Sequence, residues 1–365
     1  MSPVAHVWIG ANVSGTVPGG MRRHMVLHAR GLEELGVRTT LAFGDDAVSF
    51  GVPAIDARTG GARLLAGTLA ALRRDPPDVI NVHSASAPAF VAARRAGLLT
   101  GKVVAMSYAA DERALSVIPG ASPAVLRRLR AHVPYRASMR FASGVWCVSR
   151  QDADYYIERY RVRPDRVRYL PHAIEATFFE RLDVPRLPTQ LAFVGTWNRR
   201  KGDDVILGAM AEVARARPDV TLVIAGTLGT EADVRDRFSA EARGRVRVVP
   251  RLDDAALRRL YHESALLLVP SRLEGMPFTM LEAMACGSPA LAADNSGMRD
   301  AIADGENGWL LSTFEPSAWA AKMLELVGSP PRLRAASDAA RVHAERFRLR
   351  PLSEAALSWY DSLPP

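Results

Sequence analysis

A chain of 365 residues is too long for one ordinary hydrophobic core and fits two domains. Its 48% hydrophobic and 24% charged content is typical of a soluble globular protein, and no uncharged apolar run reaches the roughly 18–20 residues that a membrane helix needs. The first residues lack the basic and apolar regions of a signal peptide. Two isolated cysteines, Cys147 and Cys286, indicate a reducing compartment. We therefore expect a cytoplasmic protein.

The formal net charge of +8 is unevenly distributed. The whole excess of Arg and Lys lies in residues 1–180, whereas residues 181–365 are balanced. This asymmetry favours an acidic partner for the N-terminal half, such as a phosphorylated or lipid-linked acceptor or an anionic membrane surface, although a solvated Arg-rich surface explains it equally well. A basic stretch at residues 126–140 is the candidate for peripheral contact with the inner face of a membrane, but a solvated basic helix is the favoured alternative.

Strand and helix patterns alternate along the chain. In the N-terminal half, strands are expected at residues 4–9, 37–43, 78–83, 102–106 and 144–148. A helix is expected at about residues 21–35, and Ser149 is placed to cap another. After a segment rich in proline and charge, strands are expected at residues 191–194, 221–225, 245–249, 265–269 and 289–292. Helices are expected there at residues 205–215 and 278–285, and a last one at about 352–362.

Repeated units of this kind form parallel sheets covered by helices on both faces. The sequence therefore predicts an α/β protein with two doubly wound, Rossmann-like domains. We place the N-terminal domain at residues 1–178, a linker at 179–190, the C-terminal domain at 191–345 and a final helical segment at 346–365.

Ligands of such sheets bind beyond the carboxyl ends of strands, where helix N-termini attract phosphate. Gly19 and Gly20 follow the first strand and would let the backbone approach an anion closely, although an ordinary tight turn is an equally good explanation. No G-x-G-x-x-G follows this strand, so a nicotinamide dehydrogenase is discounted. In the second half, Arg200 and Lys201 lie in a strand-to-helix loop, where fixed cations can stabilise a departing diphosphate.

Two glutamates flank the start of the helix predicted at residues 278–285. Glu274 and Glu282 are eight residues apart, which corresponds to roughly 12 Å along a helix. A nucleotide sugar carries hydroxyl groups at both ends, on the hexose and on the ribose, and two carboxylates at this separation suit that shape. Because Glu282 lies among apolar residues, we expect its carboxylate to be partnered or functional.

These elements resemble retaining glycosyltransferases of the GT-B fold, specifically glycosyltransferase family four (group 1). The resemblance covers nearly the whole chain and is densest from Leu191 to Leu311. The motif P-S-x-x-E-G…L-E-A-M-A-x-G-x-P is complete from Pro270 to Pro289. Further matches are Lys201, the pair Gly19-Gly20, and the segments 168–175 and 304–310. The resemblance implies two domains facing across a cleft, with the last helix crossing back to the first domain.

The resemblance also implies the activity. The chain would transfer a hexosyl-type sugar from a nucleotide-diphosphate sugar to an acceptor hydroxyl, with retention of anomeric configuration and without a metal or cofactor. A UDP-sugar is favoured over a GDP-sugar. The acceptor would be a glycan, a lipid-linked molecule or a small molecule, in the biosynthesis of glycans, glycolipids, polysaccharides or secondary metabolites.

The family's site residues map onto this sequence as follows. Lys201 and Arg200 would bind the diphosphate, Glu274 would hold the hexose, and Glu282 would hold the ribose. The other donor contacts implied by the resemblance are Gly19, Gly20, Thr196, Arg251, Gly275, Met276, Pro277 and Phe278.

Three positions depart from the family pattern. The segment at residues 172–175 stands in place of the family's N-G-V-D and is interpreted as a structural variation. Thr196 stands where many members have arginine, so Arg199 or Arg200 must supply that charge. Tyr108 follows the strand at residues 102–106 where many members have histidine, and it is a candidate contact to acceptor or donor. His83 is a second candidate, although a strand-end histidine that is satisfied within the core explains it equally well.

A possible metal motif and two alternative functions bear on the assignment of a sugar transferase. Asp152-Ala-Asp154 spells a D-x-D metal motif, but it falls early in a predicted helix, so we expect no metal site. A nucleotide-sugar epimerase or a phosphorylase on the same fold is the first alternative activity. A nucleic-acid-binding module is the second, and it is disfavoured because aromatic residues are sparse among the arginine clusters.

Overall fold

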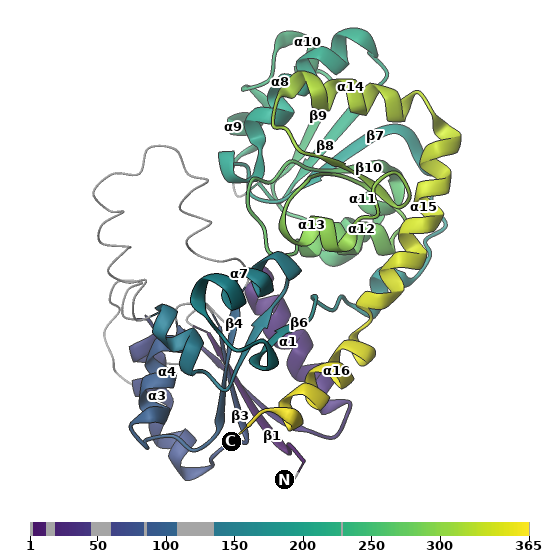
Figure 1. Ribbon diagram of the computed structural model, residues 1–365. Helices are drawn as coiled ribbons and strands as arrows, with labels where there is room; N and C mark the ends of the chain where they lie inside the picture. The colour runs from purple at the N-terminus through teal and green to yellow at the C-terminus, as the bar shows by residue number, and fades with distance from the viewer. Residues whose placement is uncertain are drawn as a thin grey trace, which may run out of the picture. The chain divides into compact units, whose positions relative to one another are not determined.

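The structure is a computed structural model that describes residues 3–11, 19–44, 60–83, 86–107, 135–227 and 229–364. The chain divides into two compact units (Figure 1). The first unit comprises residues 1–173 and 347–365, and the second unit comprises residues 174–346.

The first unit contains a six-stranded parallel sheet in the order β2-β1-β3-β4-β5-β6. Its strands are β1 (His6–Ala11), β2 (Arg38–Phe43), β3 (Val79–His83), β4 (Lys102–Ser107), β5 (Gly144–Cys147) and β6 (Val167–Tyr169). Its helices are α1 (Gly20–Glu33), α3 (Gly60–Arg74), α4 (Ala87–Arg95), α7 (Arg150–Tyr160), the 3-10 turn η3 (Pro164–Arg166) and α16 (Leu349–Ser362).

The second unit contains another six-stranded parallel sheet, in the order β12-β11-β10-β7-β8-β9. Its strands are β7 (Leu187–Val194), β8 (Thr221–Ala225), β9 (Val246–Val249), β10 (Ser264–Val269), β11 (Ala290–Ala293) and β12 (Gly308–Leu311). Its helices are α8 (Asp203–Ala216), α9 (Glu231–Arg235), α10 (Ala240–Arg243), α11 (Asp254–Glu263), α12 (Phe278–Ala285), α13 (Ser296–Ala301), α14 (Pro316–Val327) and α15 (Pro330–Ala344), with the 3-10 turns η4 (Ala176–Phe179) and η5 (Arg199–Lys201). A last 3-10 turn, η6 (Glu345–Phe347), spans the point at which the chain passes from the second unit back to the first.

Both sheets confirm the predicted α/β class. The burial of the strands explains why their sequences are runs of apolar residues. Every residue of β1 and of β10 is buried, as expected for central strands with helices on both faces. The edge strand β2 instead shows partial exposure along most of its length. The short edge strand β6 was missed by the sequence analysis because none of its three residues is fully buried and it carries no apolar run.

The boundaries of the predicted linker differ from the structure at both ends. Residues from Ile174 onward belong to the second unit, because Phe178 is fully buried there and its carbonyl accepts a hydrogen bond from the Cys286 thiol at 3.4 Å. At the other end, β7 begins at Leu187, inside the expected linker, because this stretch pairs with β10. Polar composition alone had concealed the start of this strand.

The last helix, α16, is part of the first unit and packs on α1. Gly31 of α1 permits the close approach, since a Cβ there would lie 2.0 Å from the Ser353 hydroxyl oxygen. The Tyr360 hydroxyl forms hydrogen bonds with His28 at 2.9 Å and with Asn81 at 2.6 Å. Among the residues that the structure describes, no helix combines the length and the apolar character needed to cross a bilayer.

Each sheet has one point at which the strand order reverses. This point lies between β1 and β3 in the first unit and between β7 and β10 in the second. Crevices for ligands open at the carboxyl ends of the two strands that flank such a reversal. The loops that follow these strands are therefore the places to look for a site.

Candidate functional site

Two loops meet at the reversal point of the second sheet. The loop Gly195–Gly202 follows β7, and the loop Pro270–Pro277 follows β10, its neighbour in the sheet. Gly202 has a φ of +81°, and a Cβ at this residue would lie 2.2 Å from the Pro270 carbonyl oxygen. Glycine is thus required here both by the backbone conformation and by the contact between the two loops.

This contact brings together the three residues predicted to be catalytic. One carboxylate oxygen of Glu274, Oε1, lies 2.6 Å from the Lys201 Nζ and 2.8 Å from the Arg200 Nη1. Arg200 also donates a hydrogen bond to the Leu273 carbonyl at 3.1 Å. The Lys201 and Glu274 side chains are only 17% and 13% exposed, so this ion pair is more shielded from water than an ordinary surface pair.

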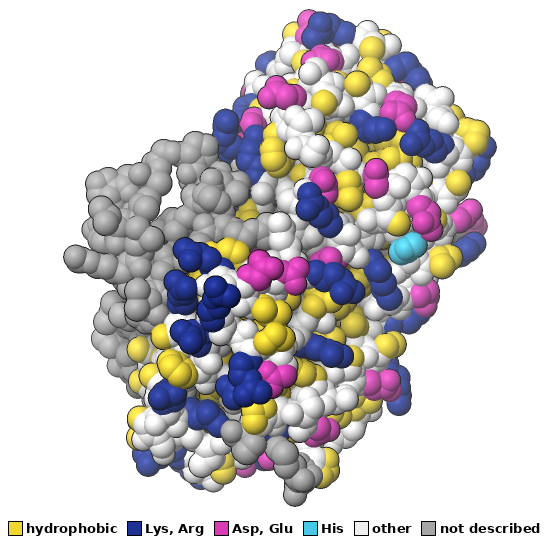
Figure 2. Space-filling model, viewed as in Figure 1, with side chains coloured by type: hydrophobic (Ala, Val, Ile, Leu, Met, Phe, Trp, Pro, Cys, Tyr) yellow, Lys and Arg dark blue, Asp and Glu magenta, His cyan; other side chains and the backbone are white. Residues whose placement is uncertain are grey.

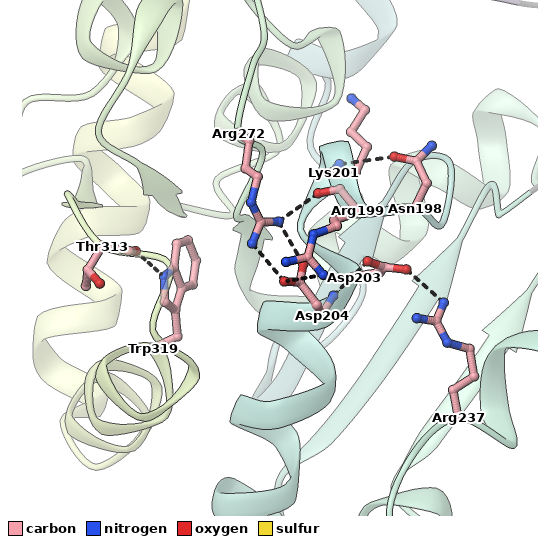
Figure 3. Close-up of polar contacts among 9 residues, drawn as sticks. All are labelled: Asn198, Arg199, Lys201, Asp203, Asp204, Arg237, Arg272, Thr313 and Trp319. Carbon is pink, nitrogen blue, oxygen red and sulfur yellow. Dashed lines mark hydrogen bonds and ion pairs between the residues drawn. The ribbon is translucent and has the colours of Figure 1, made fainter. Parts of the chain in front are cut away.

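The cationic loop is held by its own backbone and by the opposite loop. The Asn198 side chain caps η5 by accepting a hydrogen bond from the Lys201 backbone amide at 3.1 Å. From the second loop, Arg272 donates to the Arg199 carbonyl at 2.7 Å and forms a two-pronged ion pair with Asp204 (Figure 3). Burial raises the pKa of Asp204, but the hydrogen bonds and charge of Arg272 outweigh this effect and leave the pKa below its ordinary value.

Glu282 lies in the middle of α12 and is 1% exposed. Its Oε2 accepts a hydrogen bond from the Tyr261 hydroxyl at 3.4 Å, so the predicted need for a polar partner is met inside the second unit. The loop that leads into α12 is largely buried, including Gly275, Met276 and Pro277. Pro277 occupies the N-cap position of α12.

The other predicted donor contacts of the second unit are more peripheral. Thr196 is half-buried, and its hydroxyl accepts a hydrogen bond from the Asn198 side chain at 3.2 Å. Arg251 is exposed after the end of β9, and Phe278 is half-buried at the start of α12. The structure leaves the Arg200 guanidinium, and not the Thr196 side chain, beside the Lys201–Glu274 pair.

In the first unit, Gly19 and Gly20 stand at the reversal point. Gly19 caps α1 in an extended conformation, Gly20 begins the helix, and both are exposed. A Cβ at Gly19 would meet nothing within 4 Å, so the described neighbours do not themselves demand glycine there. Tyr108, the other candidate contact in this unit, lies outside the described residues.

His83 ends β3 at the same edge, but it is 1% exposed and belongs to a buried histidine cluster. This histidine cluster consists of His24, His28, His83 and His172. The Nδ1 atoms of His24 and His172 lie 3.0 Å apart, and the ring of His24 lies 5.4 Å from that of His83. This cluster was not predicted from the sequence, although the i, i+4 spacing of the two histidines in α1 is a visible signal.

Burial sets the ionisation of the histidine cluster. Desolvation lowers the pKa of His28 and of His172 to about 3. The pKa of His83 is also lowered to about 3, by desolvation first and then by the neighbouring His28 and His172. These side chains are therefore neutral at pH 7, and the cluster works as polar packing between α1, β3 and the segment after β6.

The D-x-D segment has a structural role. Asp152 is fully buried at the start of α7, where it accepts a hydrogen bond from the Ser149 hydroxyl at 2.9 Å. Its own amide donates to the Ser149 oxygen at 3.1 Å, which is the cap predicted from the sequence. Within the described ranges, no group of three or more His, Cys, Asp or Glu side chains is arranged to hold a metal ion.

Two family models match consecutive parts of the chain. The model of Glycosyltransferase Family 4 matches residues 18–178, and the model of Glycosyl transferases group 1 matches residues 175–343. Together they account for most of the sequence, and the chain belongs to the group 1, family four glycosyltransferases.

Individual relatives agree with this assignment. The D-inositol 3-phosphate glycosyltransferase of Segniliparus rotundus is 30% identical over 223 residues, which make up 57% of this chain and 50% of the relative. The chain thus spans about half the length of the curated relatives it matches.

Solved structures establish the GT-B fold. Sucrose-phosphate synthase from Thermosynechococcus elongatus superposes with a TM-score of 0.82 at 17% identity, covering 98% of each chain. HepE from Anabaena gives a TM-score of 0.72 at 17% identity, covering 98% of this chain and 100% of HepE.

Proposed function

We propose that the protein transfers a hexosyl-type sugar from a nucleotide-diphosphate sugar to an acceptor hydroxyl, with retention of anomeric configuration. The observation that carries this proposal is the convergence of Lys201 and Arg200 on one oxygen of Glu274 at the reversal point of the second sheet. Two fixed cations at this place suit a diphosphate, whose negative charge grows as the bond to the sugar breaks.

The same arrangement explains how the donor would enter. With the donor bound, its diphosphate oxygens would replace the Glu274 carboxylate as partners of the two cations. Glu274 would then accept hydrogen bonds from the hexose hydroxyls, while Glu282, from inside α12, would accept those of the ribose. The backbone N–H groups of Gly275, Met276 and Phe278, at the start of α12, would complete the contacts to the hexose.

A nucleotide sugar is favoured as donor by the solved relatives, since HepE was crystallised with UDP-glucose. We accordingly favour a UDP-sugar over a GDP-sugar, and we propose that Gly19 and Gly20 meet the diphosphate and that Arg251 borders the base. No step of this proposal calls for a metal or a further cofactor, because Lys201 and Arg200 take up the leaving charge.

We further propose an anionic acceptor. The N-terminal half carries the whole excess of positive charge, and basic side chains gather over the first unit in Figure 2, whereas both signs alternate over the second. The relatives named D-inositol 3-phosphate glycosyltransferase point to a phosphorylated polyol as one such acceptor. A lipid-linked acceptor at the inner face of the cytoplasmic membrane would fit the same charge.

The decisive experiment is a donor screen followed by a transfer assay. UDP-, GDP- and ADP-sugars are added to the pure protein and thermal unfolding is recorded, because a ligand present at 100 times its Kd stabilises the native state by about 2.7 kcal/mol. The stabilising donor is then incubated with inositol 3-phosphate and with other phosphorylated and lipid-linked acceptors. We expect stabilisation by a UDP-sugar and a product that keeps the anomeric configuration of the donor.

Other outcomes would point to another activity. Epimerised or free sugar formed without any acceptor would indicate an epimerase, and turnover that requires inorganic phosphate would indicate a phosphorylase. A protein that no nucleotide sugar stabilises would contradict the proposal altogether.

A further inference from the structure

We infer that Arg272 is a positioning residue of the donor site, which sets the cationic loop so that Lys201 and Arg200 face the diphosphate. This inference rests on the proposed function, because that function gives Lys201 and Arg200 the task of binding the diphosphate. Arg272 occupies one of the two unspecified positions of the P-S-x-x-E-G motif, and its contacts in the structure show what it does there.

Arg272 joins the two loops of the site through its side chain and its backbone. Its Nη1 donates to the Arg199 carbonyl at 2.7 Å, and its backbone amide donates to the Arg200 carbonyl at 2.9 Å. Two consecutive carbonyls of η5 are therefore held from the opposite loop. Because each peptide group is planar, fixing these carbonyls also fixes the peptide planes next to the Cα atoms of Arg200 and Lys201. The starting directions of these two side chains are thereby set.

The guanidinium of Arg272 is itself held on two further sides. Its Nη1 and Nη2 pair with the two carboxylate oxygens of Asp204 at 2.7 and 2.8 Å, and the group lies over the Phe314 ring at 4.8 Å. The side chain is only 14% exposed. A planar, forked cation can satisfy a carboxylate and a carbonyl at once, whereas a lysine ammonium cannot reproduce this geometry.

Figure 3 shows the consequence for Lys201. The Lys201 side chain points away from the network formed by Arg272, Asp204 and the Arg199 carbonyl, while its backbone amide is held by Asn198. The network thus anchors the backbone and leaves the ammonium group to meet Glu274 at 2.6 Å. Arg272 stands two residues before Glu274, so one short segment carries both the anchor and the carboxylate.

The adjacent aspartate provides an internal control. Asp203 is paired with Arg237 at 2.7 Å, on the other side of the start of α8 (Figure 3). Among the described residues, the side chain of Arg237 donates to Asp203 and its backbone amide donates to the Val234 carbonyl, so neither bond involves a loop of the site. The two arginines therefore brace neighbouring residues of one helix, but only Arg272 reaches the cationic loop.

The test compares Arg272→Gln with Arg237→Gln. Binding of UDP, GDP and ADP is measured by calorimetry, donor KM and kcat are measured in the transfer assay, and thermal unfolding is recorded for each variant. We expect Arg272→Gln to weaken binding of the preferred nucleoside diphosphate by about ten-fold or more and to lower kcat as well, since hydrogen bonds of charged groups are lost from the loop. Arg237→Gln removes an ion pair beside the same helix start and should bind the nucleotide as the wild type does.

Arg272→Lys separates charge from geometry. It keeps the positive charge but cannot bridge Asp204 and the Arg199 carbonyl, so we expect it to resemble Arg272→Gln in nucleotide affinity. If Arg272→Gln does not fold, Arg272→Lys and Asp204→Asn decide the question in its place. Wild-type nucleotide affinity in the folded Arg272 variants would overturn the inference, as would equal losses in the Arg272 and Arg237 variants.

Failure of the proposed function has a different signature. In that case the wild-type protein binds none of the three nucleoside diphosphates. Binding that is lost in Lys201→Ala but kept in Arg272→Gln would leave the proposed function standing and remove Arg272 from the site.

Discussion

The two sheets reverse their strand order in the same way, yet the chemistry at the two reversal points is different. The second unit places Lys201 and Arg200 against a single carboxylate, which we propose the diphosphate of the donor replaces. The first unit places His83 there, inside a buried and neutral histidine cluster. The two copies of one architecture thus differ at this place. The edge of the second sheet at Lys201 and Glu274 is charged, and we call it the exchangeable edge. The edge of the first sheet at His83 is uncharged and tightly packed, and we call it the packed edge. Function follows the side chains and not the fold.

A fall in pH should reveal the largest difference between the two edges, because it should lower the stability of the unit that holds the histidine cluster. The three histidines with a folded pKa near 3 bind a proton in the unfolded chain below about pH 6.5, but in the folded chain only below about pH 3. Between these values the unfolded state binds more protons, so the free energy of unfolding decreases as the pH falls. Each histidine adds a slope of up to about 1.4 kcal/mol per pH unit, or about 4 kcal/mol for the three.

Denaturant unfolding at pH 7.5, 6.5 and 5.5 measures this slope, and hydrogen exchange assigns it to a unit. We expect protection to fall in β1 and β3 before it falls in β7 and β10. His83→Leu should reduce the slope by about one histidine's share. Equal loss of protection in both sheets would show that the histidine cluster is not the acid-sensitive element.

Removal of the lysine should have the largest effect on activity. Lys201→Ala takes away the more shielded of the two cations at Glu274. Loss of a fixed charge that stabilises a developing negative charge costs about 10²–10³ in kcat. Of the three lysines of the chain, Lys322 offers a control, since its ion pair with Glu325 lies in α14. Near-normal turnover in Lys201→Ala, measured beside Lys322→Ala, would refute the assigned site.

The sequence was sufficient to place Lys201 and Glu274 beside the strands that carry them. The 278–285 helix was predicted with the bounds it has, because its apolar residues lie between Pro277 and Gly287, which mark the two ends. Lys201 and Glu274 were each identified from local motifs. Their direct pairing was not predicted, because it depends on β7 and β10 being neighbours in the sheet although they are far apart in the chain.

The packed edge was much harder to predict. His83 could be described only as a strand-end histidine, since its partners come from α1 and from the segment after β6. Arg272 was overlooked for a related reason. A motif names the residues that touch the ligand, and says little about a residue whose task is to hold another loop in place.

The loop at Gly275 is proposed to hold the hexose end of the donor and not its nucleotide end. The Gly297 amide donates to the Gly275 carbonyl at 2.7 Å, and a Cβ at Gly297 would lie 2.1 Å from that oxygen. Gly297→Ala should therefore displace the loop that is proposed to hold the hexose. We expect about ten-fold weaker binding of the UDP-sugar with little change for UDP alone, measured by calorimetry.

Gly208→Ala is the matched control for this substitution. Its Cβ would lie 2.6 Å from Pro316, between α8 and α14, which disturbs packing of the same unit away from the site. Its stability should fall while its binding of UDP-sugar and UDP stays as in the wild type. If Gly297→Ala weakened UDP and UDP-sugar equally, the loop would not be specific for the hexose.

The smallest effect is expected at Glu282. Glu282→Gln keeps the shape of the side chain and can still accept the hydrogen bond from Tyr261, but it removes the charge. Hydrogen bonds to an ionised acceptor are roughly twice as strong as neutral ones, so UDP affinity should fall about three- to ten-fold. Inhibition by pyrophosphate, which has no ribose, should not change. Glu231→Gln, which removes an exposed ion pair with Arg235 at 2.9 Å in α9, is the control for a general loss of negative charge. A pyrophosphate effect as large as the UDP effect would place Glu282 near the phosphates instead of the ribose.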